Sequence, residues 1–214
     1  MARIVKGPWM NLNAPIKSKA KSKKPGVKSS DAVYQLKIVL HGSKPAIWRR
    51  ILVRGGTSLE LLHVILQEAM GWQDCHLYFF EADKVQYNPP EMEDGFEDAE
   101  SVLNYILAAV APEPKAKIKY EYDMGDGWMH AITVEKILPA DAKLKLPYCV
   151  AGERACPPED CGGLWGYYAM LDILGDPKHP DYAEMKERIC DDFDPDAFDL
   201  EAVNKRLKRL ANSR

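Results

Sequence analysis

The chain has 214 residues, of which 46% are hydrophobic and 29% charged, and its formal net charge is −3. A chain of this size and composition can bury a sizeable core, which favours a globular protein with one main domain. No apolar run approaches the roughly 18–20 residues that cross a bilayer, and the N-terminus lacks the apolar core of a secretion signal. We therefore expect a cytoplasmic protein without a membrane partner.

Residues 1–30 differ in charge from the rest of the chain. They contain eight Lys and Arg residues and no acid, so the remaining residues carry a net charge of −11. Ser, Pro and Gly separate the lysines without a hydrophobic period, which is typical of a disordered basic tail. Clustered positive charge can neutralise phosphates, so nucleic acid is one candidate partner. A solubilising tail that lies against its own acidic domain is the favoured interpretation.

Two strands open the folded domain, which we expect to begin near Asp31. Apolar and polar residues alternate over residues 33–41, and a second run over 47–53 follows a turn. This period is typical of half-buried strands, and a hairpin is their simplest connection. Arg49 and Arg50 point to opposite faces, which places one of them where it can be buried against a carboxylate.

The clearest predicted helix covers residues 59–70. Its leucines recur at helical spacing, Thr57 and Glu60 form a capping-box pattern before it, and Gly71 ends it. His63 lies beside the apolar stripe. A boundary histidine with a hydrogen-bond partner therefore explains His63 better than a ligand role does.

The middle of the chain alternates between regular and irregular patterns. We expect a short strand at 76–81, an exposed excursion at 88–98 and a helix at 99–110. Alternating apolar residues then predict a hairpin with strands at 117–123 and 128–134.

His130 shares the apolar face of the second hairpin strand with Trp128 and Ile132. A histidine on such a face needs a polar partner, which Asp123 or Asp126 of the turn can supply. A core histidine held by a backbone carbonyl or an aspartate is favoured slightly over a metal or catalytic role.

Residues 147–167 contain three of the five cysteines, three prolines and four glycines. A patternless segment of this length predicts a long ordered loop, and its aromatic residues disfavour disorder. Helices are predicted at 163–174, 181–190 and 199–210. The fold class is therefore α+β, with a mixed or antiparallel sheet of hairpins packed by helices, a helical C-terminal part and a single domain over residues 31–214.

Five motifs in this order carry a family resemblance. They are IWRRI, LLHVILQEAMGWQDCHLYFF, YEYDMGDGWMHAITVE, AGERACPPEDCGGLWGYY and FDPDAFDLEAVNKRL. Over about residues 33–210 the chain resembles the family named after the third open reading frame of plasmid pRiA4b. That family is similar to insertion-sequence passenger proteins, some of them labelled resolvases. The resemblance implies an α+β fold and an association with plasmids and mobile elements.

The residues themselves disfavour a recombinase. A tyrosine recombinase needs a histidine followed three residues later by arginine, and none of the five histidines has one. A serine recombinase needs a catalytic serine in a folded N-terminal domain, whereas the N-terminal serines lie in the basic tail.

Zinc binding is one alternative function. Cys149, Cys156 and Cys161 are separated by six and four residues, which is looser than paired zinc knuckles. His130 or His76 can serve as the outside ligand of such a site. The cysteines are otherwise buried small apolar groups, which is common for free cysteine.

A hydrolytic enzyme is the other alternative, although the sequence has no recognised catalytic signature. The two distinctive motifs supply groups that can converge as acid, base and anion clamp. These candidates are His130, Asp123, Asp126, Arg154, Glu159 and Asp160. Between the alternatives, we favour a binding or interaction module whose surface combines residues 123–130 with residues 149–163.

Overall fold

The computed structural model describes residues 30–92, 98–189 and 193–212. Its centre is one eight-stranded mixed sheet with strand order β5-β4-β3-β6-β7-β1-β2-β8. All neighbouring strands are antiparallel except β4 and β5, which are parallel. The strands are β1 (Val33–Leu40), β2 (Trp48–Arg54), β3 (Tyr78–Ala82), β4 (Val85–Asn88), β5 (Glu100–Ser101), β6 (Lys117–Tyr122), β7 (Trp128–Leu138) and β8 (Tyr148–Glu153).

Five α-helices and two short 3-10 helices complete the described fold. They are α2 (Leu59–Met70), η1 (Pro90–Met92), η2 (Val102–Asn104), α3 (Leu107–Val110), α4 (Gly163–Gly175), α5 (Tyr182–Arg188) and α6 (Leu200–Asn212). The α+β class, both predicted hairpins and the helical C-terminal part are confirmed. Apart from Ser30, the predicted basic tail lies outside the described residues. Within the described ranges, no helix has both the length and the apolar character that a bilayer span requires.

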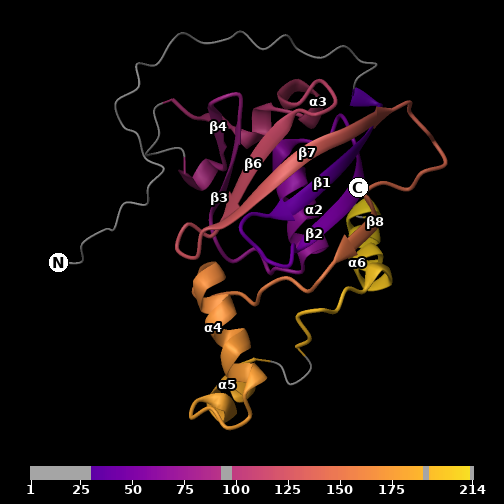
Figure 1. Cartoon of the computed structure of the whole chain (residues 1–214). Helices are drawn as coiled ribbons and strands as arrows, with labels where there is room; N and C mark the ends of the chain where they lie inside the picture. The colour runs from indigo at the N-terminus through magenta and orange to yellow at the C-terminus, as the bar shows by residue number, and fades with distance from the viewer. Residues whose placement is uncertain (1–29, 93–97, 190–192, 213–214) are drawn as a thin grey trace.

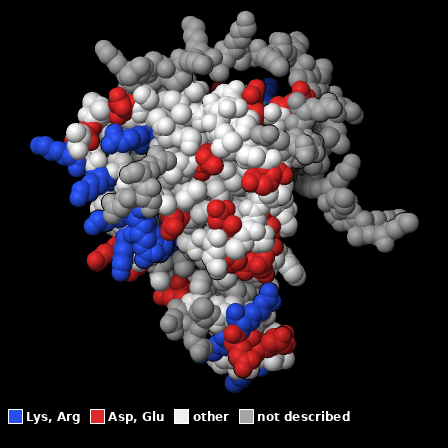
Figure 2. Space-filling model, turned by 180° about the vertical axis from the view of Figure 1, so that it is seen from behind, with Lys and Arg blue, Asp and Glu red and all other residues white. Residues whose placement is uncertain are grey.

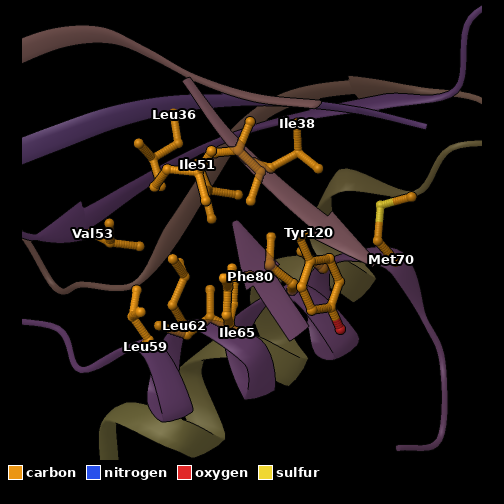
Figure 3. Packing of buried hydrophobic residues seen from close by; sticks show 14 of the residues in the cluster. Leu36, Ile38, Ile51, Val53, Leu59, Leu62, Ile65, Met70, Phe80 and Tyr120 are labelled. Atoms are coloured by element: carbon orange, nitrogen blue, oxygen red, sulfur yellow. The ribbon is translucent and has the colours of Figure 1, made fainter. Parts of the chain in front are cut away.

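The core lies between α2 and one face of the sheet. Alternate residues of β1 and β2 point toward the helix because successive strand residues face opposite sides. Figure 3 shows Leu36, Ile38, Ile51 and Val53 above Leu59, Leu62 and Ile65 of α2. The helix thus supplies one apolar stripe and the central strands supply the other.

The ends of α2 are fixed by Ser58 and Gly71. Ser58 has extended backbone geometry and its hydroxyl accepts a hydrogen bond from the Leu61 amide, so it is the N-cap in place of the predicted Thr57. Gly71 has a φ of 105°, and its N–H donates to the Gln67 carbonyl. This left-handed residue ends the helix and turns the chain toward β3.

Three sequence predictions of secondary structure were wrong. The described part of the exposed excursion expected at 88–98 includes the end of β4 and all of η1, and Asn88 and Met92 are buried. Residues 99–110 form β5, η2 and α3 instead of one helix, because the Leu107 and Ala108 amides donate to the carbonyls of Thr57 and Gly55. Residues 148–153 form strand β8 along β2, where a loop was predicted.

The edge strand β8 has an unusual partner. The side-chain oxygen of Asn204 in α6 accepts from the Cys149 amide at 2.8 Å, and the Asn204 side-chain nitrogen donates to the Cys149 carbonyl at 2.9 Å. One side-chain amide therefore makes both hydrogen bonds that a neighbouring strand would make with this residue.

Helices α4 and α5 form an arm that projects from one end of the sheet (Figure 1). The start of α4 lies against the β6–β7 turn, and the hydroxyl of Tyr168 accepts a hydrogen bond from the Lys44 amide at 2.6 Å.

Basic side chains gather on the side of the molecule where α6 lies, whereas acidic ones are spread over the rest of the face in Figure 2. In α6, Arg206 donates to the Glu68 carbonyl of α2, which ties the two helices together.

Leu62 tests the α2–sheet core. Leu62 is fully buried, so Leu62→Ala should lower the free energy of unfolding by about 2–5 kcal/mol in urea titrations. The control Leu103→Ala, at a side chain that is 50% exposed, should change it by less than about 0.5 kcal/mol. Equal losses in both variants would contradict this assignment of the core.

Candidate metal centre

Three segments from different parts of the chain meet at the end of the sheet that carries the arm. Residues 71–77 follow α2, residues 123–127 form the β6–β7 turn, and residues 154–162 join β8 to α4. Figure 1 shows the β6–β7 turn reaching toward α4. His76 comes from the first segment, Asp123 from the second, and Glu159 and Asp160 from the third.

Three carboxylate oxygens surround Nε2 of His76. Asp160 Oδ1 lies at 3.1 Å, Asp123 Oδ2 at 3.7 Å and Glu159 Oε2 at 3.8 Å. Nε2 is shielded from solvent, yet none of the three oxygens lies in hydrogen-bonding geometry with it. Ligands that share a cation at about 2.1 Å are themselves about 3.0–3.5 Å apart. The Asp160 oxygen is at such a distance from Nε2, and the Asp123 and Glu159 oxygens lie slightly beyond it.

This group stands out in the part of the chain that the structure describes. It is the only set of at least three His, Cys, Asp or Glu side chains there that is arranged to hold a metal ion, and the ligand atoms of His76, Asp123 and Asp160 all lie within 4.8 Å of one another. One nitrogen and several carboxylate oxygens form a donor set suited to a divalent cation.

The Asp123 carboxylate is held by its own turn. Its Oδ1 accepts hydrogen bonds from the Gly125 amide at 2.9 Å and the Asp126 amide at 3.3 Å. The other oxygen, Oδ2, faces His76. Because the turn fixes one oxygen, the second is oriented toward the centre before any ligand binds.

The Glu159 carboxylate is oriented in a similar way by two donors. Its Oε1 accepts from the Gln73 amide at 2.8 Å and from the Tyr122 hydroxyl at 3.2 Å. Burial raises the pKa of Tyr122, so its hydroxyl stays protonated and able to donate at neutral pH. Oε2 faces His76 and also accepts a longer hydrogen bond from the Tyr122 hydroxyl, at 3.4 Å.

Within the described ranges the carboxylates of the centre have no Lys or Arg ion-pair partner, since Arg188 hydrogen-bonds the backbone carbonyl of Asp160 and not its carboxylate. Like charges this close repel one another, and a divalent cation between them would offset the repulsion. The Asp160 side chain is 72% exposed, so one side of the centre is open to solvent.

Two of the carboxylate residues have strained backbones. The φ angles of Asp123 and Asp160 are 54° and 52°, in the left-handed region that residues other than glycine seldom adopt. Aspartate adopts this region more readily than most residues, because its side chain can hydrogen-bond the local backbone. Asp83, Lys84 and Lys115, outside this group, also have positive φ.

The turn and the loop are joined by tight contacts between Asp126 and the start of α4. Asp126 Oδ2 accepts from the Gly162 amide at 3.0 Å. Gly163 has a φ of 67°, and a β-carbon there would overlap the Asp126 carbonyl oxygen. Asp126, predicted as a catalytic group, instead connects the two segments that carry the carboxylates.

The structure brings together three of the six predicted catalytic candidates, Asp123, Glu159 and Asp160, and adds His76. Arg154 pairs with Asp196 and does not join this group. His130 is also apart from it, buried at 0% exposure beside Trp72 and Tyr120. The sequence predicted His76 only as an outside zinc ligand and as the first residue of a strand, whereas β3 begins at Tyr78 and His76 lies in the segment before it.

His130 is a core histidine, as the favoured prediction has it, but neither Asp123 nor Asp126 is its hydrogen-bond partner, and it is unsuited to a metal or catalytic role. Burial lowers its pKa to about 3, so the ring is neutral at physiological pH. It has no solvent-accessible surface with which to contact a ligand. The alternating pattern of β7 had placed it on the apolar face, and that face is the interior of the protein.

The predicted zinc ligands do not form a set with one another in the described residues. Cys149 is buried and its amide is bound by Asn204. Burial raises the pKa of Cys156 and of Cys149, and raises that of Cys161 to about 12. Because zinc binds the thiolate, these raised pKa values favour packing roles for the cysteines.

His63 has the structural role that its helical position predicts. Its Nδ1 lies 2.8 Å from the Tyr120 hydroxyl and its Nε2 lies 2.7 Å from Asp74 Oδ1. Its ring also stacks on Tyr78, with 3.5 Å between centroids. Both ring nitrogens are occupied, so His63 has none left for a ligand.

Comparison with known proteins supports the resemblance seen in the motifs. A family model described as plasmid pRiA4b ORF-3-like protein matches residues 32–202. The uncharacterized protein y4hQ of Sinorhizobium fredii is 38% identical over 183 residues, which cover 84% of this chain and 93% of y4hQ. The crystal structure of MM3350, a protein of unknown function from Methanosarcina mazei Go1, has a TM-score of 0.72 and 35% identity, and the match covers 79% of this chain and 96% of that chain.

His130 should make stability depend on pH. The folded-state pKa of about 3 lies below the ordinary 6.5, so the unfolded chain binds a proton first as the pH falls. The contribution of neutral His130 to stability is therefore complete above pH 6.5 and is lost as the pH falls toward 3. Between pH 7.5 and pH 5, the wild type should lose about 1–2 kcal/mol more than His130→Phe in urea titrations. The exposed-site control His179→Gln should keep the wild-type dependence, and equal losses in wild type and His130→Phe would refute this account.

Gly163 should be needed for the contact between turn and loop. Gly163→Ala places a β-carbon against the Asp126 carbonyl at a left-handed φ, and should lower the free energy of unfolding by about 1–3 kcal/mol. Gly175→Ala is the matched control, since no atom lies within 4 Å of the added carbon, and its stability should stay within about 0.5 kcal/mol of wild type. Thermal unfolding of both variants measures the difference, and an unaffected Gly163→Ala would contradict the tight contact.

Proposed function

This chain belongs to the plasmid pRiA4b ORF-3-like family, and we propose that it binds a divalent cation through His76, Asp123 and Asp160, with Glu159 beside them as a further carboxylate. The observation that carries the proposal is the placement of three carboxylate oxygens within 3.8 Å of one shielded imidazole nitrogen, none of them in hydrogen-bonding geometry. A histidine that served only as a hydrogen-bond donor would direct its N–H at one of these oxygens.

The donor set selects among cations. Imidazole nitrogen suits zinc and other transition metals, whereas several carboxylates suit manganese, magnesium and calcium. A mixed set of one nitrogen and up to three carboxylates therefore favours Zn²⁺ or Mn²⁺. Zinc bound by the cysteines was one alternative that the sequence offered, and the present proposal instead uses oxygen and nitrogen ligands.

The open side of the centre supports a binding module with the cation at its surface. A structural zinc site is closed by four protein ligands, whereas Asp160 here is mostly exposed and leaves space for water or a ligand. The same openness favours metal-assisted hydrolysis as a second candidate, since a bound cation lowers the pKa of a coordinated water. In this form the hydrolase hypothesis uses His76 in place of His130.

Other predictions from the sequence are independent of this centre. Nucleic-acid contact through residues 1–30, the association with plasmids and mobile elements, and a cytoplasmic location are retained as hypotheses. The cation proposal does not depend on any of them.

Cation binding can be measured directly on the full-length chain. After dialysis against chelator, isothermal titration with Mn²⁺ or Zn²⁺ and native mass spectrometry should show one ion per chain. His76→Gln and Asp123→Asn should each weaken binding at least about tenfold, because each removes a ligand while retaining side-chain size. The side-chain amide that Asp123→Asn introduces keeps an oxygen for the turn amides, so circular dichroism should show an unchanged fold.

Two controls make this result specific. His179→Gln removes a histidine whose Nδ1 lies 3.8 Å from Asp181 at an exposed site, and it should leave binding unchanged. Cys156→Ser should also leave it unchanged. Loss of the ion in Cys156→Ser, with retention in His76→Gln, would return the metal to the cysteines and refute the proposal.

A further inference from the structure

A pocket of about 480 Å³ lies beside the candidate metal centre. Its walls come from the end of α2, the loop before α4, and the arm helices α4 and α5. Its volume is in the range of pockets that bind small molecules. The apolar lining residues are Met70, Trp72, Met170, Met185, Ile189 and Phe193.

Glu159 connects this pocket to the centre. It lines the pocket, and its Oε2 lies 3.8 Å from His76 Nε2. Its other oxygen is fixed by the amide of Gln73, which is also a lining residue. A molecule in the pocket would therefore have one end next to the proposed cation.

Arg188 supplies positive charge at the same end of the pocket. Its Nη2 donates to the Asp160 carbonyl at 3.2 Å, which holds the guanidinium beside a residue of the centre. A guanidinium has five N–H donors. Within the described ranges Arg188 forms no ion pair with a carboxylate, so donors remain for an anion.

These observations define the chemistry of a ligand, and the inference rests on the proposed cation site. We propose that the pocket binds an apolar organic phosphate monoester, with its hydrocarbon part among the methionine and aromatic side chains. Its phosphate lies between Arg188 and the cation. Phosphate has three terminal oxygens, so it can contact a guanidinium and a metal ion at once. The flexible methionines can adapt to the shape of the hydrocarbon part.

Calorimetry of the full-length, Mn²⁺-loaded protein tests this with four probes. Hexyl phosphate should bind at least about tenfold more tightly than inorganic phosphate, which lacks the apolar part, and than hexan-1-ol, which lacks the anion. Hexyl phosphate should also bind more tightly than hexanoate, because a carboxylate has only two oxygens to share between the guanidinium and the cation. Removing Mn²⁺ with chelator should weaken hexyl phosphate binding by a similar factor.

Two substitutions separate the contributions of the pocket. Arg188→Gln should weaken hexyl phosphate and inorganic phosphate alike, whereas Met185→Ala should weaken hexyl phosphate alone. Arg54→Gln is the matched control. Arg54 is an exposed arginine at the last position of β2 and does not line the pocket, so this variant should bind both probes as the wild type does. Circular dichroism confirms that the variants are folded.

The outcomes distinguish this inference from the proposed function. If Mn²⁺ binds but hexyl phosphate binds no more tightly than inorganic phosphate or hexan-1-ol, the pocket assignment fails and the cation site stands. Equal binding of hexanoate would overturn the preference for phosphate, and equal binding without Mn²⁺ would overturn the contact with the cation. If neither Mn²⁺ nor Zn²⁺ binds in the absence of phosphates, both proposals fail.

Discussion

The buried guanidinium of Arg49 fixes the spacing of the segments that carry the candidate centre. Its Nε donates to the Ala69 carbonyl in the last turn of α2 at 3.0 Å, and its Nη1 donates to the carbonyls of Trp48 and Glu153 at 2.8 and 2.9 Å. The chain leaves α2 toward His76, and it leaves β8, just after Glu153, toward Asp160. One side chain from β2 thus holds the starting points of two of the three segments.

Arg49 does this without a carboxylate partner, contrary to the expectation that a buried arginine in β2 would pair with an acid. Burial lowers its pKa, but arginine starts high enough to remain charged. Its charge is satisfied by backbone carbonyls and by the ring of Phe198, which lies 4.6 Å away. A β-carbon at Gly152 would overlap Phe198 and the Arg49 side chain, so glycine is required where these groups approach β8. Arg50, on the opposite face, makes the carboxylate pair instead, with Glu135.

Periodicity predicted the fold better than it predicted the site. The alternation in β7 correctly places His130 on an apolar face, and for that reason it lies in the core and cannot join carboxylates at the end of the sheet. Asp123, Glu159 and Asp160 were found because they occur in distinctive turn and loop motifs. His76 received less weight because the groups around it, Asp123 and Asp160, are far away in the sequence, and the spacing of nearby residues does not predict such contacts. Strand β8 was missed because cysteine and glycine obscure its alternation, and because its pairing with β2 is equally non-local.

The side chain of Asn204 has a consequence for how this protein behaves at high concentration. An edge strand offers unpaired amides and carbonyls to any other extended chain, and many aggregates begin at such an edge. In β8 the amide and carbonyl of Cys149 are already occupied by Asn204, in the way that an added strand would occupy them. We therefore expect α6 to hinder edge-to-edge pairing of molecules at this position of β8.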